Sequence, residues 1–179
     1  FNDATRLLLQ LGHRRFALLN APEHLSFAIA RNTGVTEALM AQGLTMQPDF
    51  VQHSPMTEEY GYRGMMRLLD QPEPPTAVLC SSIVLALGVV RAINERGLQL
   101  GRDVSLIAHD DVFPYLKAEN FSTPLTTTRS SIRQAGARIA ERLIGEVAGI
   151  AAHPQPEIWK AELIVRPSTG PVPYTPPTL

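Results

Sequence analysis

Polar side chains follow nearly every short apolar segment of this sequence, at the points where buried strands would end. In open α/β sheets, ligands bind beyond the carboxyl ends of the strands. Polar residues are also common wherever a strand reaches the surface, which is the alternative at each single position. Five such positions in succession favour a polar pocket that forms hydrogen bonds with the hydroxyl groups of a ligand. They are Asn20, His53, Ser81–Ser82, His109–Asp110–Asp111 and Arg129–Ser130.

Arg31 lies in the middle of the helix predicted after the first of these strands. Its guanidinium is a planar fork of five donors, and Asp110 could accept hydrogen bonds from the same ligand. A donor and an acceptor facing each other across a pocket suit a sugar, whose adjacent hydroxyls both donate and accept. Two alternatives stay open: Arg31 only solvates its helix, or it forms an ion pair with Asp110.

The sequence carries none of the common motifs of catalysis. No G-x-S-x-G pattern surrounds Ser81 or Ser82, and neither a Walker A loop nor G-x-G-x-x-G occurs. The histidines are scattered, without H-E-x-x-H or an i, i+4 pair. His109 beside two aspartates could act as an acid or base, but the sequence shows neither a nucleophile nor a cofactor loop to go with it. Cys80 is expected to be a small buried side chain of the core and not a reactive thiol. We therefore expect no enzyme activity, no cofactor and no metal ion.

An alternation of short apolar strands and longer helices must position these side chains. Strands alternating with helices of this length predict βαβ units and a parallel sheet, so the fold class is α/β. We expect strands over 16–19, 49–52, 76–80, 104–108, 125–128 and 159–166, and helices over 3–11, 25–41, 57–69, 82–95 and 132–147.

The composition narrows the functional classes. A length of 179 residues fits one domain, or one domain and part of another. Sixteen Lys and Arg against 17 Asp and Glu give a net charge of −1, which argues against a strongly basic surface for nucleic acid or membranes. One cysteine excludes an intrachain disulfide. With neither a signal peptide nor an apolar run of membrane-spanning length, we expect a cytoplasmic protein.

Several segments spread over the chain form a series whose order and spacing can be compared with known families. They are Leu11–Leu19 (LGHRRFALL), Ala30–Gly34 (ARNTG), Pro74–Ser82 (PPTAVLCSS), Ala86–Gly88 (ALG), Gly97–Asp111 (GLQLGRDVSLIAHDD), Pro124–Arg129 (PLTTTR) and Leu163–Thr169 (LIVRPST). Together they resemble the lactose-repressor (LacI/GalR) family of bacterial transcription regulators, in its effector-binding part. The resemblance runs from Asp3 to about Gly170.

The resemblance implies a two-lobed fold like that of the periplasmic sugar-binding proteins, with three crossovers between the lobes. In that layout residues 1–12 are a fragment of the N-terminal lobe and 13–128 are a complete C-terminal, effector-binding lobe of parallel strands. Residues 129–158 return into the N-terminal lobe, 159–170 form the final strand and crossover, and 171–179 are an irregular tail. The helix-turn-helix that reads DNA, the hinge helix and most of the N-terminal lobe would precede residue 1, which accounts for a chain that starts directly on an apolar helix.

The resemblance also implies roles for individual residues. Arg31 matches the arginine that grips sugar hydroxyls, and Asp110 matches the aspartate opposite it. Ser82 falls where the family often has asparagine, and Met56 where an aromatic residue often stacks on the ligand. Ile83 stands where the family usually has an aspartate, and Met56 offers no flat ring for stacking. Because of these two departures, the resemblance does not identify the specific sugar. Two further residues, Phe27 and Ser130, line the cleft by analogy.

A dimer and an allosteric mechanism follow from the same resemblance. Effector binding between the lobes would set the spacing of paired DNA-binding heads, and a homodimer would form partly through the helix after Ser82. That helix has an apolar stripe, which could form the dimer interface or, alternatively, be buried against the chain's own sheet. Two other functions are alternatives. A periplasmic sugar-binding receptor shares the fold but would need an export signal, and a sugar-processing enzyme would need catalytic motifs; the sequence shows neither. The stripe consists of Leu85, Val89, Val90 and Ile93.

Overall fold

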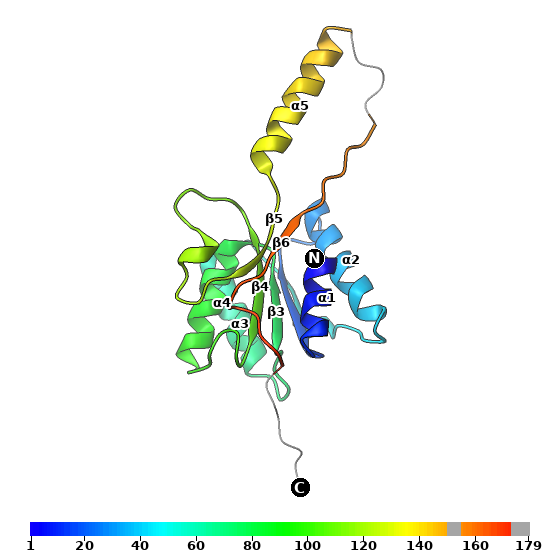
Figure 1. The fold of residues 1–179 in the computed structure, drawn as a ribbon. Coiled ribbons are helices and arrows are strands. Elements are labelled where there is room, and N and C mark those ends of the chain that lie inside the picture. Colours follow the sequence, from blue (N-terminus) through cyan, green and yellow to red (C-terminus); the bar gives the residue numbers. More distant parts are fainter. Residues whose placement is uncertain (150–154, 173–179) are drawn as a thin grey trace.

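A six-stranded sheet lies at the centre of the computed structural model, which describes residues 1–149 and 155–172 (Figure 1). The strand order is β2-β1-β3-β4-β5-β6. The first five strands pair in parallel, and the last pairs antiparallel with β5. The sheet is therefore mostly parallel, as the alternating sequence pattern predicts. The strands are β1 (Phe16–Asn20), β2 (Val51–His53), β3 (Ala77–Cys80), β4 (Ser105–Asp110), β5 (Thr126–Arg129) and β6 (Glu162–Ile164).

Helices cover both faces of the sheet. One apolar cluster joins α1 (Asn2–Gln10) and α2 (Ser26–Met40) to one face, and a second joins α3 (Glu58–Leu69) and α4 (Ile83–Glu95) to the other. Side chains alternate along each strand, so Leu18 and Ile107 belong to the first cluster while Leu19 and Leu106 belong to the second. Two short 3-10 helices, Pro48–Phe50 and Ala118–Asn120, lie in the connections.

The opening helix packs against this same body, and the assignment of residues 1–12 to the N-terminal lobe stays a prediction. Ala4 and Leu8 of α1 are fully buried and pack with Val35 and Leu39 of α2. The apolar positions of α1 recur at helical spacing, so one face is covered by α2 and the sheet edge beneath it. Helix α1 thus shares the apolar cluster that α2 forms on this face of the sheet.

The stripe expected to form a dimer interface is largely buried inside the chain. Leu85, Val89 and Ile93 are 0% exposed and belong to the core between α4, α3 and the sheet, while Val90 is only partly buried. The alternative reading, burial against the chain's own core, is therefore correct for these three residues. Helices α3 and α4 approach closely, since a Cβ on Gly88 would overlap the Glu58 carbonyl oxygen.

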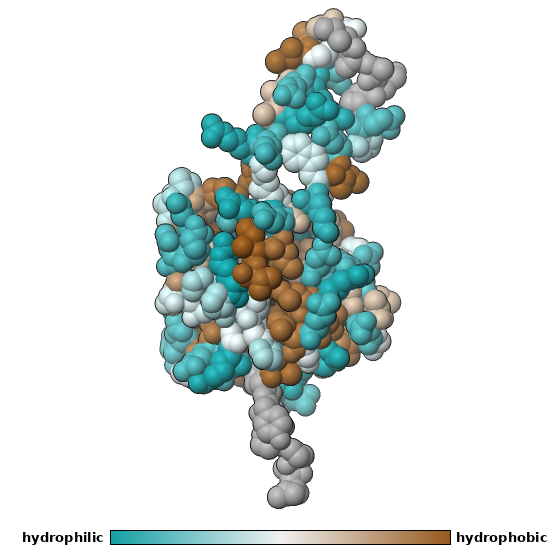
Figure 2. Space-filling view, in the orientation of Figure 1, coloured by the Kyte–Doolittle hydropathy of each residue, from teal (hydrophilic) through white to brown (hydrophobic). Residues whose placement is uncertain are grey.

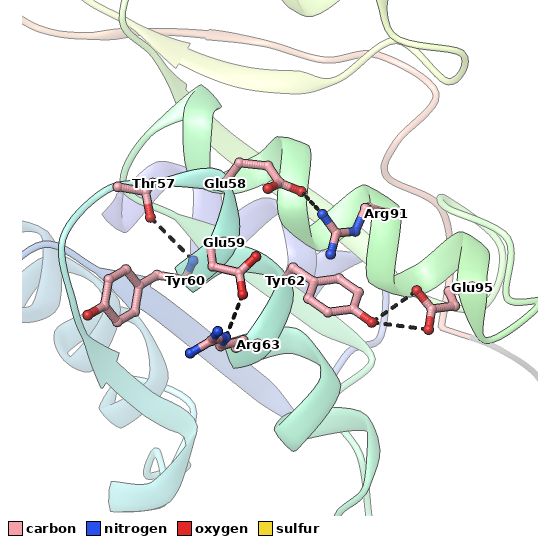
Figure 3. Close-up of polar contacts among 8 residues, drawn as sticks. All are labelled: Thr57, Glu58, Glu59, Tyr60, Tyr62, Arg63, Arg91 and Glu95. Carbon is pink, nitrogen blue, oxygen red and sulfur yellow. Dashed lines mark hydrogen bonds and ion pairs between the residues drawn. The ribbon is translucent and has the colours of Figure 1, made fainter.

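Polar contacts fasten the outer surfaces of α3 and α4 to each other (Figure 3). Arg91 on α4 pairs with Glu58 at 2.6 Å and lies over the ring of Tyr62 on α3, 3.7 Å from its centroid. The Tyr62 hydroxyl donates to the Glu95 carboxylate at 3.0 Å. The contact between these helices is therefore apolar inside and charged at its rim.

Helix α5 (Ile132–Val147) stands away from the body, and none of its residues is buried (Figure 1). Its apolar side chains are open to solvent: Ile139 is 67% exposed and Ile144 is 69% exposed. Figure 2 shows apolar residues at the surface near the far end of this projection. The assignment of residues 129–158 to a second lobe stays a prediction.

Most predicted elements occur within one or two residues of their expected bounds. The final strand is the exception: it is expected over 159–166 but covers only Glu162–Ile164 and runs antiparallel. The expected tail, 171–179, lies outside the described residues except for 171 and 172. Among the residues that the structure describes, no helix is long and apolar enough to cross a membrane, and no three His, Cys, Asp or Glu side chains gather as metal ligands would.

Candidate functional site

The candidate site lies where the strand order reverses direction. From β1 the chain passes through α2 to β2 on one side, and then through α3 to β3 on the other side of β1. The helices that follow β1 and β3 therefore lie on opposite faces of the sheet, which opens a crevice at the carboxyl ends of these two strands. Ligands of open α/β sheets bind at such points.

Asn20, the last residue of β1, joins the three elements around this crevice. Its side chain is fully buried, and Nδ2 donates to the Ala28 carbonyl oxygen of α2 at 2.9 Å. Its Oδ1 accepts hydrogen bonds from the Ala21 amide at 3.0 Å and from the Ser81 hydroxyl that follows β3. Asn20 thus holds α2 in place over the ends of β1 and β3.

Arg31 reaches from α2 across the crevice to the end of β3. Its Nη1 donates to the Ser81 carbonyl oxygen at 2.7 Å. The guanidinium lies over the rings of Phe27, 4.8 Å from the centroid, and Phe1, at 5.4 Å. Burial lowers the pKa of Arg31 and the nearby Asp111 carboxylate partly opposes this shift, but an arginine stays charged. The fork is therefore fixed in direction, with further N–H groups available to a ligand.

The two faces of β4 separate the residues at its carboxyl end. Ile107 points to the α1–α2 face and Ala108 to the α3–α4 face. By the same alternation His109 lies on the side of Arg31, and Asp110 lies on the other side. Among the described residues no ion pair joins Arg31 to Asp110. The cation nearest Asp110 is Arg129, with Nε 3.9 Å from Oδ2.

Asp111, one of the strand-end residues of the predicted pocket, has a role that neither the sequence nor the resemblance assigned. Its Oδ2 accepts hydrogen bonds from the Ser82 hydroxyl at 2.6 Å and from the Ile83 amide at 3.0 Å. A carboxylate at the first turn of a helix is favoured by the helix dipole, so Asp111 stabilises the start of α4. It also contributes a negative charge near Arg31. Adjacent aspartates after a strand must point to different sides, and this signal was present in the sequence.

His109, another of the predicted strand-end residues, also lies in the site. Its Nδ1 lies 3.2 Å from the Thr128 hydroxyl of the neighbouring strand β5. Burial, and next the positive charge of Arg31, lower the pKa of His109 to about 4, although Asp111 and Asp110 oppose the shift. The imidazole is therefore neutral at neutral pH. From the sequence, His109 is one of the strand-end residues of a polar pocket and a conceivable acid or base, without an assigned ligand contact.

The remaining predicted site residues lie in several places. Phe27 contacts Arg31, as described, but Ser82 uses its hydroxyl to cap α4, donating to Asp111 and accepting from the Val84 amide at 3.1 Å. Met56 packs against the α3–α4 core. Ser130 lies in a different hollow, between α5 and the segment 157–160. Asp110 lines a shallow pocket with the loop that follows β4.

Comparisons with known proteins agree with this geometry. Residues 5–169 match the family model of the periplasmic binding protein-like domain. The chain is 64% identical to the HTH-type transcriptional regulator AglR of Rhizobium meliloti (strain 1021) over 97% of its length, and it spans about half of that relative, 49%.

Two solved structures show the same fold. A complex of the transcriptional regulator CelR with cellobiose is 27% identical, with a TM-score of 0.85 over 93% of this chain and 50% of that one. The lac repressor dimer bound to operator and the anti-inducer ONPF is 30% identical, with a TM-score of 0.82 over 94% of this chain and 58% of that one. The chain belongs to the periplasmic binding protein-like domain family, in the form carried by transcriptional regulators of the LacI family.

Proposed function

We propose that this chain is the effector-binding region of a DNA-binding transcriptional regulator, and that its effector is a sugar or sugar derivative. The observation that carries the proposal is the position of Arg31, which is fixed across the crevice at the carboxyl ends of β1 and β3 by its bond to the Ser81 carbonyl oxygen. A partly buried, oriented guanidinium beside an aromatic ring can bind a hydroxyl group and cover an apolar sugar face. The CelR complex with cellobiose supports this ligand class.

The predicted contacts divide into two groups. Arg31 and Phe27 form the α2 side of the site, and Asp110 supplies an acceptor from the opposite face of β4. Ser82 acts through the start of α4, because its hydroxyl already has two partners. Contacts from Met56 and Ser130 would require a neighbouring lobe or a closed state, and they stay predictions.

The mechanism that we propose is allosteric. Effector binding at this edge would favour one conformation of the regulator and thereby change its affinity for operator DNA. Such coupling is typically about 1–3 kcal/mol, or about 5- to 150-fold in affinity, and it acts equally in both directions. AglR is named as a helix-turn-helix (HTH) type transcriptional regulator, and this chain spans about half of the length of AglR. DNA binding, in the cytoplasm, would therefore use a helix-turn-helix head outside these residues.

A homodimer would use the outward face of α4, which contains only Val90 of the stripe first expected. Leu87 is 36% exposed, and Val84 and Val90 are partly exposed, whereas Leu85, Val89 and Ile93 are buried. Leu87→Asp would then shift the full-length regulator from dimer to monomer in sedimentation, and Leu85→Asp would unfold it. A dimer of unchanged stability in Leu87→Asp would contradict this interface.

Calorimetry on the full-length regulator tests the site. Maltose, sucrose, trehalose and cellobiose are titrated into the wild type, and the disaccharide that binds best is then used with Arg31→Ala, Arg31→Lys and Asp110→Asn. We expect each variant to bind at least about tenfold more weakly, including Arg31→Lys, which keeps the charge but loses the fork.

The control for this experiment is Arg63→Ala, which removes an exposed arginine that pairs with Glu59 on α3. It should leave sugar affinity unchanged. Failure of the whole panel to bind the wild type would contradict a sugar effector, and wild-type affinity in both Arg31 variants would contradict the site. Operator binding in a gel shift should survive in the Arg31 variants, while its response to the sugar should be lost.

A further inference from the structure

The two ring nitrogens of His109 differ in their partners. Nδ1 is held by the Thr128 hydroxyl, which fixes the orientation of the ring on the Arg31 side of β4. Nε2 has no hydrogen-bond partner among the described residues. Since no buried side-chain nitrogen or oxygen in that part of the chain lacks a partner, Nε2 must be reached by solvent. The ring is half-buried and its Nε2 is accessible to solvent, so Nε2 can form a hydrogen bond with a ligand.

The groups around Nε2 restrict the chemistry of that ligand. Arg31 can only donate hydrogen bonds, and the carboxylates of Asp110 and Asp111 can only accept them. The neutral imidazole accepts at Nε2 when Nδ1–H donates to Thr128, and it donates at Nε2 in the other tautomer. A hydroxyl fits both tautomers, because it can accept from Arg31 and either donate to Nε2 or accept from it.

An anionic oxygen fits this position less well than a hydroxyl. It would satisfy Arg31, but it would face the Nε2 lone pair in one tautomer and the negative charge of Asp111 in both. The start of α4, which could otherwise attract an anion, is already occupied by the Asp111 carboxylate. The local charges therefore favour an uncharged group beside Arg31.

We propose that His109 is a specificity-determining residue of this site, which selects an effector hydroxyl that bridges its Nε2 and the Arg31 guanidinium. This inference rests on the proposed function. It adds a ligand contact from the strand β4 on the α2 side, whereas Asp110 contacts the ligand from the other side. The ring needs Thr128 to keep Nε2 aimed at the crevice.

The test uses the full-length regulator and the disaccharide of the panel that binds the wild type best, together with its monodeoxy derivatives. In the wild type, one derivative should bind about 5- to 20-fold more weakly than the parent sugar, since a lost hydrogen bond has about this effect. His109→Phe should weaken the parent sugar by a similar factor, and it should not weaken that one derivative any further. His109→Gln, which keeps a polar group, should recover part of the affinity.

Each outcome distinguishes this inference from the function on which it rests. If no disaccharide binds the wild type, the sugar-binding function fails and this inference fails with it. If the sugar binds but His109→Phe and His109→Gln keep wild-type affinity, only the role of His109 is wrong. Equal losses for the parent and for every deoxy derivative would show a general structural effect and would also overturn the inference. Arg63→Ala is again the control, and thermal unfolding verifies that each variant is folded.

Discussion

The two ends of the central sheet each carry a histidine, and the two histidines differ in how their nitrogens are used. At the amino ends of the strands, His13 is completely buried: Nδ1 lies 2.9 Å from the Thr76 hydroxyl, and Nε2 lies 3.0 Å from both the Ser105 hydroxyl and the Gly170 carbonyl oxygen. At the carboxyl ends, His109 has one partner and a nitrogen open to solvent. Burial lowers the pKa of both residues.

The segment after β6 completes the contrast. It crosses the amino ends of β4 and β5, where the Leu106 amide donates to the Ser168 carbonyl oxygen and the Ser168 hydroxyl donates to the Leu106 carbonyl oxygen. No buried side-chain nitrogen or oxygen among the described residues of this junction lacks a partner, so this end stabilises the fold. The carboxyl end keeps unused donors and acceptors at Arg31 and His109. Polar groups are thus satisfied within the chain at the amino end, whereas the carboxyl end, where we propose that the effector binds, leaves some of them open to a ligand.

The largest expected effect is the loss of His13. His13→Ala would leave the hydroxyls of Thr76 and Ser105 and the Gly170 carbonyl oxygen without their partner and would open a cavity, so the free energy of unfolding should fall by about 4 kcal/mol. His109→Ala, the matched change at the other end, should cost about 1 kcal/mol or less. Urea unfolding measures both. Equal losses would remove the distinction between the two ends.

Gly101 tests the same junction through the backbone. Its φ is +82°, and a Cβ there would overlap the Pro167 carbonyl oxygen, so Gly101→Ala should displace the crossing segment and cost about 3 kcal/mol. Gly97 is the matched control, because its φ is +68° and nothing lies within 4 Å of its Cβ position. Gly97→Ala should cost about 1 kcal/mol. If the two variants lose the same stability, the segment is not tightly held.

The sequence predicted the sheet well because its signal is local. Apolar runs between helices indicate buried strands, and Thr57 and Ser82 are helix N-caps whose side chains accept from Tyr60 and Val84 amides as expected for such residues. The burial of Leu85 inside the chain's own core could not be predicted from such local signals. An apolar stripe on a helix is the same whether it faces its own core or a second chain.

The site was predicted only in part for a similar reason. Arg31 could be placed at the crevice because its helix follows β1. Which acidic residue stands near it depends on the face to which each side chain of β4 points, and that follows from the register of the strand. The resemblance drew attention to Asp110, whereas alternation puts His109 on the Arg31 side and lets Asp111 reach α4.

The pH dependence of stability separates His109 from a simple surface residue. Its pKa is about 4 in the folded chain against an ordinary 6.5, so the unfolded state binds the proton first. The stabilisation is complete above pH 6.5 and is lost as the pH falls toward 4; it amounts to about 2 kcal/mol after allowance for the partial exposure of the ring. Urea unfolding from pH 7 to 4.5 should show this loss in the wild type and a smaller loss in His109→Phe. Parallel curves would contradict it.

The smallest expected difference concerns the two threonines that hold the rings. Thr76 and Thr128 are both buried, and each hydroxyl contacts the Nδ1 of a histidine. Thr76→Val leaves the His13 nitrogen buried without a partner and should cost about 2 kcal/mol. Thr128→Val should cost only about 1 kcal/mol, because the partly exposed ring of His109 can turn toward water. The same variant should weaken sugar binding, since Nε2 is then no longer aimed at the crevice, whereas Thr76→Val should leave sugar affinity unchanged. Unfolding and calorimetry on the two variants measure both differences, and a reversed order of the two losses would show that the carboxyl end is the more rigid one.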